Sequence, residues 1–555
     1  MIGELPPAHV THEVLNQAPT LEGYNLFEQD RALVAALERE GALWAHERVT
    51  QLGAIAGGEP FRWGVQANAS PPVLRSHDRF GYRIDEVEYH PAWHQLMQLA
   101  VEHELHALPW RSPRPGAHVA RAALFYILSQ AEAGHGCPIS MTYSSLPALR
   151  VQPDVAAEWE PRLTSTEYDP RMLPAPQKRG ALCGMAMTEK QGGSDVRANT
   201  TRAVPLGAGG PGAEYAITGH KFFCSAPMCD AFLLLAHTPR GLSCFLMPRW
   251  LPDGTRNRFH VQRLKDKLGN RSNASSEVEF DGAWARMVGE EGRGVVTIIE
   301  MVNHTRLDCV IGAAAGMRQA LSQATHHAAY RSAFGKRLIE QPLMQNVLTD
   351  LCLESEAATV SMMRLARAYD DAAETGERSF PRIATAVIKY WVCKRHPVVV
   401  AEALECLGGS GYVEESIMPR LYREAPLNSI WEGSGNVICL DVLRAMSREP
   451  DTVEAFFDEL GLAAGGDARL DAFVDALRAD LQDFSAIETR ARRLVERMAL
   501  ALQGALLVRA GDSDVTEAFC ASRLAGDHGL AFGTLPAGID FARIVERARP
   551  QLDAA

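Results

Sequence analysis

The sequence has no apolar run long enough to cross a membrane. Its 555 residues are 46% hydrophobic, but polar side chains interrupt every stretch before the roughly 18 apolar residues that a spanning helix needs. The first ten residues lack a basic start followed by an apolar run, so no signal peptide is expected. We therefore expect a cytoplasmic protein without a membrane partner.

Paired cysteines and metal-ligand patterns are also missing. The 11 cysteines are scattered singly from Cys137 to Cys520, and no C-x-x-C pair occurs. An odd, dispersed set in a large chain fits reduced thiols better than a disulfide framework. The pairs His90/His94 and His103/His106 have metal-like spacing but no clear third ligand. Isolated surface or core histidines are the better interpretation, and no metal is expected.

An excess of positive charge is absent. The formal net charge is −12, which argues against a general polyanion binder, although a local basic patch is compatible with it. Residues 451–555 hold no lysine at all, and their 11 arginines are outnumbered by 18 acidic residues. The remaining composition is that of an ordinary globular protein, and the length predicts roughly three or four domains.

The pattern of apolar residues changes twice along the chain. Between Asn25 and Leu163 the apolar spacing is typical of helices, one of which begins at Asp30 and ends at Gly41. From Ala181 to Val288 short β-like runs alternate with Gly, Pro and Asn, which predicts a small antiparallel barrel or sandwich.

Long helical segments return after Gly292. Segments 295–304, 311–332, 343–371 and 383–407 predict an antiparallel bundle, and more helices follow Arg448. We predict an α+β protein of four domains. They are an N-terminal helical domain (1–180), a β-barrel-like domain (181–290), a helical bundle (291–447) and an extra C-terminal helical domain (448–555).

The run from Ser429 to Asn436 places Trp431 and Glu432 before a flexible Gly-Ser-Gly turn. An apolar neighbour disfavours the ionised form of a carboxyl group, so its pKa can rise toward the range of a general base. Taken alone, such a pair is more often a buried ring beside a solvated charge. Other motifs in the chain decide between the two interpretations.

Five motifs, in this order, resemble those of the acyl-CoA dehydrogenase flavoproteins. They are Met187–Val196 (MTEKQGGSDV), Gly219–Ser225 (GHKFFCS), Arg331–Lys336 (RSAFGK), Leu407–Tyr412 (LGGSGY) and Trp431–Gly433 (WEG). Residues 188–195, 263–275 and 428–436 are similar in particular to the AidB branch of the bacterial adaptive response to DNA alkylation. The resemblance runs from about His12 to Arg444. It implies the acyl-CoA dehydrogenase fold, with a central antiparallel β-domain and a four-helix bundle that holds FAD.

The resemblance also implies which residues contact FAD. Met187 and Thr188 fit the pyrimidine edge of the flavin, Phe223 would stack on its ring, and Ser225 would lie near N5. Arg331 would pair with the pyrophosphate of a neighbouring subunit. Singly, each has a plainer interpretation, such as β-core for Phe223, and only the ordered combination favours a flavin site. The full set is Met187, Thr188, Gly193, Ser194, Phe223, Ser225, Arg331, Phe334, Gln341, Glu405, Gly408, Gly409, Ser434 and Asn436.

Glu432 then becomes the predicted catalytic base. By resemblance it would remove the pro-R α-proton of an acyl-CoA thioester while a β-hydride passes to flavin N5. The family's alternative base position is occupied here by Thr305, which Arg306 follows. Trp431 stands where common members carry Tyr, which could narrow the substrate channel. These last three residues are predicted to line the substrate pocket.

Three functions stay open from the sequence. The first is an FAD-dependent acyl-CoA dehydrogenase for a short or branched acyl group. The second is a flavoprotein that binds duplex DNA, for which the acidic C-terminal segment is unfavourable although Arg490, Arg492 and Arg493 could share a helix face. The third is a flavin oxidase acting on a small non-CoA molecule. A homotetramer is expected because the family shares its flavin across subunits, and the electron acceptor is undetermined.

Overall fold

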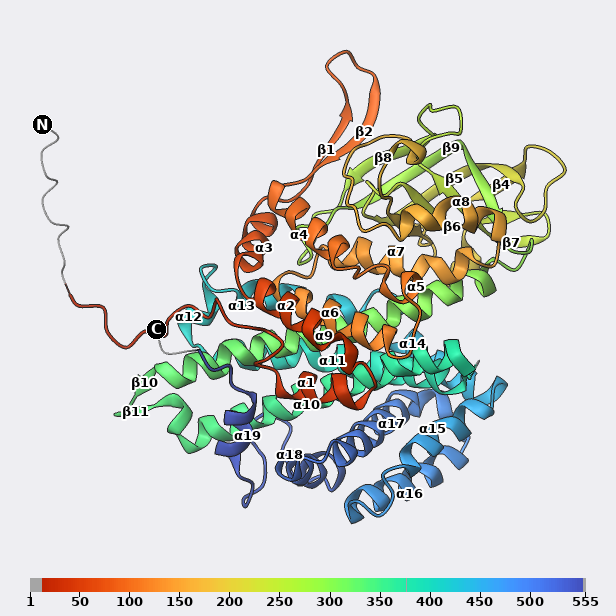
Figure 1. Cartoon of the computed structure of the whole chain (residues 1–555). Helices are drawn as coiled ribbons and strands as arrows, with labels where there is room; N and C mark the ends of the chain where they lie inside the picture. Colours follow the sequence, from red (N-terminus) through yellow and green to blue (C-terminus); the bar gives the residue numbers. More distant parts are fainter. Residues whose placement is uncertain (1–11, 376, 553–555) are drawn as a thin grey trace, which may run out of the picture.

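The chain forms a layer of N-terminal helices, a β-domain and two further groups of helices (Figure 1). The computed structural model describes residues 12–375 and 377–552. The first ten residues, on which the expected absence of a signal peptide depends, lie outside this part. Within the described residues, no helix is long and apolar enough to cross a membrane.

The N-terminal layer is helical, as the apolar spacing predicts. The predicted helix start is confirmed at Asp30, whose side chain accepts a hydrogen bond from the Leu33 amide at 3.1 Å. A hairpin that the sequence did not predict interrupts the layer, because its strands consist mostly of polar residues. The elements are α1 (Arg31–Arg39), α2 (His46–Ala56), α3 (Glu59–Ala69), β1 (Val73–His77), β2 (Arg83–Glu88), α4 (Pro91–Glu102), α5 (Leu108–Arg111), α6 (Ala117–Ala131), α7 (Gly136–Leu149) and α8 (Pro153–Leu163).

The β-domain contains one seven-stranded sheet. Its strands are β3 (Cys183–Ala186), β4 (Arg202–Pro205), β5 (Glu214–Ser225), β6 (Ala231–Thr238), β7 (Gly241–Pro248), β8 (Phe259–Leu264) and β9 (Ser275–Val288). The order is β3-β6-β4-β5-β9-β7, and an additional pairing of β6 with β7 closes a ring, as in a barrel. The expectation of a purely antiparallel domain was wrong in one respect, because β3 and β4 both pair with β6 in parallel.

Long helices build the bundle around α9. Segments 295–304 and 311–332, which the sequence predicts as two helices, form one continuous helix. The polar residues between them are buried and paired, since Arg121 on α6 donates to Asp308 at 2.8 Å. The elements are α9 (Gly294–Tyr330), β10 (Ser332–Ala333), β11 (Lys336–Arg337), α10 (Pro342–Thr375), α11 (Ser379–Cys406), α12 (Gly409–Tyr412), α13 (Met418–Glu424) and α14 (Gly435–Arg448).

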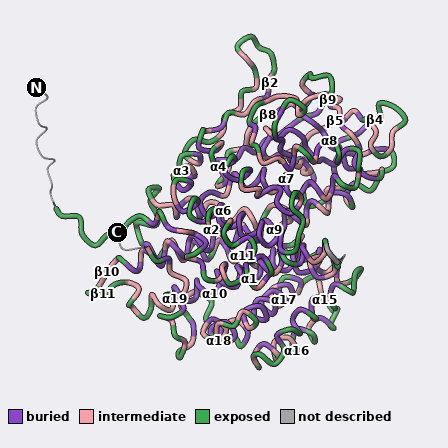
Figure 2. The backbone as a smooth tube through the Cα atoms, viewed as in Figure 1, coloured by how far each residue is buried: buried purple, intermediate pink, exposed green. Residues whose placement is uncertain are grey.

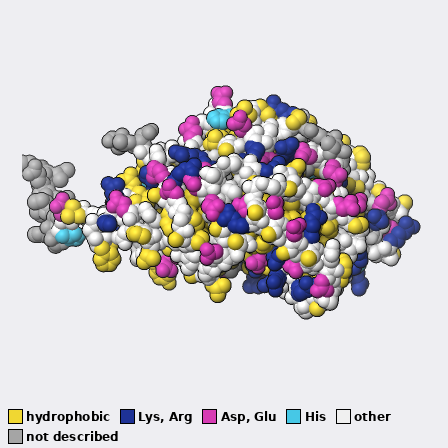
Figure 3. Space-filling view, turned by 90° about the horizontal axis from the view of Figure 1, so that it is seen from below, with side chains coloured by type: hydrophobic (Ala, Val, Ile, Leu, Met, Phe, Trp, Pro, Cys, Tyr) yellow, Lys and Arg dark blue, Asp and Glu magenta, His cyan; other side chains and the backbone are white. Residues whose placement is uncertain are grey.

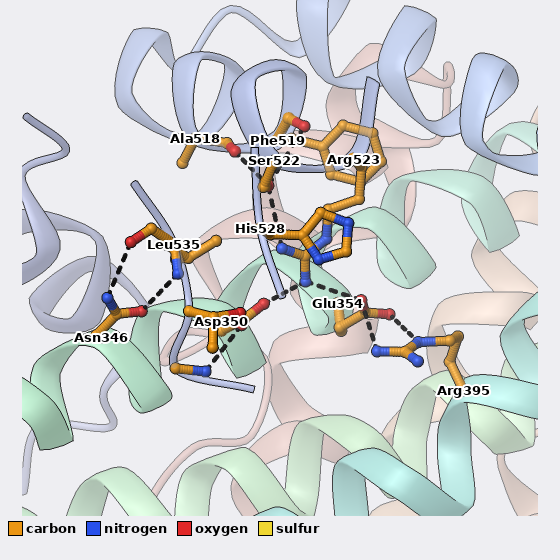
Figure 4. A network of polar contacts seen from close by, with 12 residues as sticks. Asn346, Asp350, Glu354, Arg395, Ala518, Phe519, Ser522, Arg523, His528 and Leu535 are labelled. Atoms are coloured by element: carbon orange, nitrogen blue, oxygen red, sulfur yellow. Dashed lines mark hydrogen bonds and ion pairs between the residues drawn. The ribbon is translucent and has the colours of Figure 1, made fainter. Parts of the chain in front are cut away.

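The C-terminal helices pack against one side of this bundle, below it in Figure 1. They are α15 (Asp451–Gly461), α16 (Ala468–Gln482), α17 (Ile487–Ala510), α18 (Ser513–Phe519) and α19 (Phe541–Ala548). Arg523, in the π-helical turn after α18, donates to Asp350 and, at 2.9 Å, to Glu354 on α10 (Figure 4). Arg395 on α11 donates to the same Glu354 at 3.0 Å. Buried ion pairs therefore fix this segment to the bundle.

Burial is deepest in the central helices α6, α9 and α11. The backbone of α9 and α11 is mostly buried, whereas the hairpin of β1 and β2 is exposed (Figure 2). Every residue of α6 is buried. The residues of the candidate site are carried by elements packed around this interior, which gives them rigid support.

Candidate active site

A cavity of about 980 Å3 lies where the N-terminal helices, the β-domain and the bundle meet. Its lining includes residues from α6, α7, β5, α9, α13 and α14. Most of the predicted site residues line it together, although the motifs that hold them are far apart in the sequence. They are Met187, Thr188, Gly193, Ser194, Phe223, Ser225, Thr305, Arg306, Trp431, Glu432 and Ser434.

Glu432 lies in a backbone conformation that side-chain-bearing residues rarely adopt. Its φ is +57°, and that of Gly433, just before α14, is +107°. A left-handed conformation at a non-glycine residue costs free energy and persists only where the surrounding structure enforces it. The strain therefore points to strong contacts that hold this loop.

Two buried cations hold the carbonyl groups of this loop. Lys389 on α11 donates to the carbonyl oxygens of Trp431 at 2.9 Å and Gly433 at 2.5 Å. Arg306 on α9 donates through Nε to the carbonyl oxygen of Glu432 at 3.1 Å. The three successive carbonyls are thus fixed from two different helices. Sequence reasoning missed Lys389, and its only signal is a lysine within the apolar run of α11.

The contacts of the Glu432 side chain determine its acidity. Burial raises the pKa of Glu432, because it disfavours the carboxylate. The Thr305 hydroxyl donates to Oε2 at 2.8 Å, and this bond lowers the pKa, as do the charges of Lys389 and Arg306. Burial is the larger effect. The carboxyl group is therefore a base whose pKa lies above the ordinary range, with a hydrogen bond that orients one oxygen.

The β-domain side of the cavity presents an aromatic ring and several hydroxyl groups. Phe223 on β5 keeps 46% of its surface exposed, and the hydroxyl-bearing Thr188, Ser194 and Ser225 line the same cavity. The Thr188 carbonyl accepts from the Phe222 amide at 2.8 Å, which fixes the loop against β5. A flavin ring needs an apolar cover and hydrogen-bonding groups at its edge. The residues present fit an isoalloxazine.

A half-buried lysine, Lys267, lies next to the hydroxyl groups at the position predicted for flavin N5. Ser225 Oγ is 3.3 Å from Ser275 Oγ, which accepts a hydrogen bond from Lys267 Nζ at 3.1 Å. Burial lowers the pKa of Lys267 to about 8. This lysine was not among the predicted site residues, although it belongs to the motif 263–275 that carries the resemblance. It extends the polar contacts of the site into the β-domain.

Another group of predicted residues lies away from the cavity of this chain. Phe334 is 99% exposed at the tip of the hairpin of β10 and β11, with φ of +52°. This hairpin and α12, which follows Gly408, lie at the end of the molecule remote from the β-domain (Figure 1). The residues that the cavity does not include are Arg331, Phe334, Gln341, Glu405, Gly408, Gly409 and Asn436.

Three of these residues have side-chain partners within the chain. Arg331 donates to the carbonyl oxygen of Asn16 at 2.6 Å. Gln341 donates to the carbonyl of Ala333 at 2.9 Å and so supports the hairpin. Asn436 accepts from Arg492 on α17 at 2.8 Å and therefore faces the C-terminal helices. For all three side chains, these contacts within one chain are structural.

The described residues hold no group of three or more His, Cys, Asp or Glu that could bind a metal ion. The 11 cysteines are free and buried. Cys137 lines the cavity, and burial raises the pKa of its thiol to about 11. The thiol is therefore protonated and a weak nucleophile at neutral pH.

The arginines of the C-terminal segment are mostly paired with its own acidic residues. Arg490 lies 3.2 Å from Asp483, and Arg497 lies 3.2 Å from Asp480. On the face seen from below in Figure 1, basic and acidic side chains are interspersed among apolar ones (Figure 3). A continuous basic surface, which duplex binding requires, is not evident on this face.

Three stretches of the sequence match known protein families. Residues 16–170 match the adaptive response protein AidB N-terminal domain. Residues 184–283 match the acyl-CoA dehydrogenase middle domain, and residues 292–447 match the acyl-CoA dehydrogenase C-terminal domain.

Individual relatives extend these matches over almost the whole chain. The chain is 45% identical to the AidB protein of Escherichia coli (strain K12), over 92% of this chain and 94% of that protein. It is 30% identical to acyl-CoA dehydrogenase family member 11 of Caenorhabditis elegans, over 88% of this chain and 84% of that protein. The crystal structure of C. elegans ACDH-11 in complex with C11-CoA superposes with a TM-score of 0.82 at 26% identity, covering 99% of this chain and 95% of that one. An acyl-CoA dehydrogenase complexed with FAD from Bacillus anthracis shares the fold, with a TM-score of 0.61 at 19% identity over 78% of each chain.

Proposed function

Because the chain belongs to the acyl-CoA dehydrogenase family, and within it to the AidB branch, we propose that it oxidises an acyl-CoA thioester with Glu432 as the base. The protein is an FAD-dependent, acyl-CoA dehydrogenase-like enzyme. The observation that carries the proposal is the carboxylate of Glu432, which faces the cavity and is oriented by Thr305 at 2.8 Å.

In this proposal Glu432 takes the α-proton of the thioester, and the electrons of the C–H bond form a double bond to the β-carbon. FAD, when bound, accepts the hydride that leaves the β-carbon. Thr305 keeps one carboxylate oxygen in place, while Lys389 and Arg306 hold the backbone around it. Phe223 and the hydroxyls of Thr188 and Ser225 would hold the flavin ring, and Lys267 would support Ser225 through Ser275.

The same cavity offers positive charge for the CoA phosphates. Arg197, Arg444 and Arg448 line it together with apolar residues from the beginning of α9. Guanidinium groups bind phosphate oxygens in two-pronged geometry. The C. elegans relative was crystallised with C11-CoA, which supports a medium-length acyl group here, longer than the short or branched group expected from the sequence.

The proposed activity is tested by anaerobic mixing of the holoprotein with straight-chain acyl-CoAs of graded length, from butyryl to dodecanoyl. We expect loss of the oxidised flavin absorbance with the medium-length members. Absence of bleaching across the panel would overturn the proposal. Rapid reoxidation of the reduced flavin by oxygen would instead favour the flavin oxidase.

Replacing Thr305 with valine should make the reaction more sensitive to acid. The base acts only when ionised, and the Thr305 hydrogen bond lowers the pKa of Glu432. Loss of the bond raises that pKa further, so the acid limb of the pH profile, where the rate falls as Glu432 is protonated, moves to higher pH. At pH values below this limb, flavin reduction should be up to about tenfold slower than in the wild type. A pH profile of the reduction rate measures this, and a limb that stays in place would contradict the role of Thr305.

The exposed hairpin supports a homo-oligomer, and we propose the tetramer that the sequence predicts. Arg331 and Phe334 lie outside the cavity of their own chain. They would contact FAD only if the hairpin reached the cavity of a neighbouring subunit. Phe334 is an apolar side chain at an exposed tip, and such side chains are common where chains associate.

Duplex DNA is the weaker alternative. Residues 451–555 hold more acidic than basic residues, Arg490 and Arg497 of α17 are paired with acidic side chains, and Arg492 donates to the neutral side chain of Asn436. We therefore make no proposal of DNA binding for this segment.

A further inference from the structure

The cavity continues beyond Glu432 along one face of α9. Thr305, Cys309, Gly312 and Gly316 all line it. Their spacing of four, three and four residues places them on the same side of a helix. At 1.5 Å per residue, the path from Thr305 to Gly316 is about 16 Å long. The cavity therefore extends well past the atoms that would react beside Glu432.

Two glycines on this face of α9 leave space for side chains of neighbouring segments. A Cβ at Gly316 would come 2.1 Å from Nε2 of His396, so the imidazole of α11 occupies the space of the missing side chain. A Cβ at Gly312 would lie 3.3 Å from Nδ2 of Asn428. Any larger residue at Gly316 would have to displace the imidazole.

Two polar side chains of the cavity lining have atoms without hydrogen-bond partners. His396 is 2% exposed and Gln130, on α6, is 1% exposed, and both line the cavity. Among the described residues, neither ring nitrogen of His396 has a hydrogen-bond partner, nor does Nε2 of Gln130. Buried polar groups in folded proteins are nearly always hydrogen-bonded. Two such side chains in one cavity point to a ligand that completes their bonds.

The chemistry of the two side chains defines this ligand. Burial lowers the pKa of His396 to about 3, so the ring is neutral near pH 7. A neutral imidazole has one donor and one acceptor, and the amide nitrogen of Gln130 is a donor. An uncharged group that both donates and accepts matches them. A hydroxyl group does so, whereas a methyl group leaves them unpaired.

We propose that the inner end of the cavity recognises a hydroxyl group near the far end of the acyl chain, held by His396 and Gln130. This assignment rests on the proposed function, in which Glu432 acts at the α-carbon. At roughly 1.3 Å per carbon in an extended chain, the path along α9 accommodates about ten to twelve carbon atoms. The substrate class is therefore a medium-chain, ω-hydroxylated acyl-CoA.

The test compares three acyl-CoAs with twelve carbons each: dodecanoyl-CoA, 12-hydroxydodecanoyl-CoA and the terminal carboxy analogue, dodecanedioyl-CoA. Binding is measured by calorimetry on the Glu432→Gln holoprotein, in which turnover is removed. We expect the hydroxylated compound to bind about tenfold more tightly than dodecanoyl-CoA, as one or two buried hydrogen bonds predict. Equal affinities, or a preference for the carboxy analogue through Arg420 in the same cavity, would overturn the proposal.

Two variants test whether His396 and Gln130 cause the tighter binding of the hydroxylated compound. His396→Leu and, independently, Gln130→Met should each remove most of it while dodecanoyl-CoA binds at least as well as before. A preference unchanged in the variant that folds would also overturn the assignment. Failure of the proposed function has a different signature, because the wild-type flavin would then not be reduced by any of the three compounds.

Discussion

Replacing Glu432 with glutamine is expected to slow flavin reduction by acyl-CoA at least about 10³-fold, since general-base catalysis contributes a factor of this order. Glutamine has nearly the same shape and can still accept from Thr305 and bond through its backbone carbonyl to Arg306. It cannot take a proton. The FAD content and the affinity for acyl-CoA should therefore stay close to those of the wild type, and stopped-flow absorbance measures the rate.

Glu424 provides a matched control for this change. Like Glu432, it is a carboxyl group that lines the cavity, and burial raises its pKa. Its oxygens, however, accept from the backbone and side chain of Asn270 at 2.5 and 2.9 Å, so they are already occupied. In the Glu424→Gln variant, we expect the rate of flavin reduction by acyl-CoA to stay within about tenfold of the wild-type rate. A normal rate in Glu432→Gln together with a large loss in Glu424→Gln would reassign the base.

The sequence identified the residues whose chemistry is local to a motif. Thr188, Phe223 and Glu432 come from three separate motifs, and the structure brings all three into one cavity. Such residues are recognisable because a flavin site needs a hydroxyl, an aromatic ring and a base at fixed places within each motif.

Contacts between distant segments could not be predicted in the same way. Lys389 precedes Trp431 by 42 residues, and no sequence pattern in either segment predicts that the two residues are in contact. The continuity of α9 was hidden for a related reason. Arg306 and Asp308 interrupt the apolar pattern of the helix in the sequence, yet both are buried against partners on other helices. Periodicity shows which face of a helix is apolar, but a buried ion pair looks like a solvated one.

Replacing Lys389 with methionine should produce the second large effect, about a 10²-fold fall in the rate of flavin reduction. Lys389 is 1% exposed, and its ammonium group holds the carbonyls on both sides of Glu432. Methionine fills a similar volume but leaves both carbonyls without their donor. The strained φ of Glu432 then loses part of its support. The free energy of unfolding should also fall by about 3 kcal/mol, because unsatisfied buried polar groups are costly.

The pH profile distinguishes positioning of the base from simple destabilisation. The charge of Lys389 lowers the pKa of Glu432, so its removal raises that pKa, and the acid limb of the rate should move to higher pH, as in Thr305→Val. A general loss of stability would lower the amount of active protein at every pH without moving the limb. Arg378→Met is the control, since Arg378 precedes the same helix, is 72% exposed and pairs with Glu300 at the surface. The opposite outcome is a Lys389→Met variant with the wild-type rate and the wild-type acid limb of its pH profile. In that case Arg306 and the turn alone hold Glu432 in its left-handed conformation, and the bonds from Lys389 do not position the base.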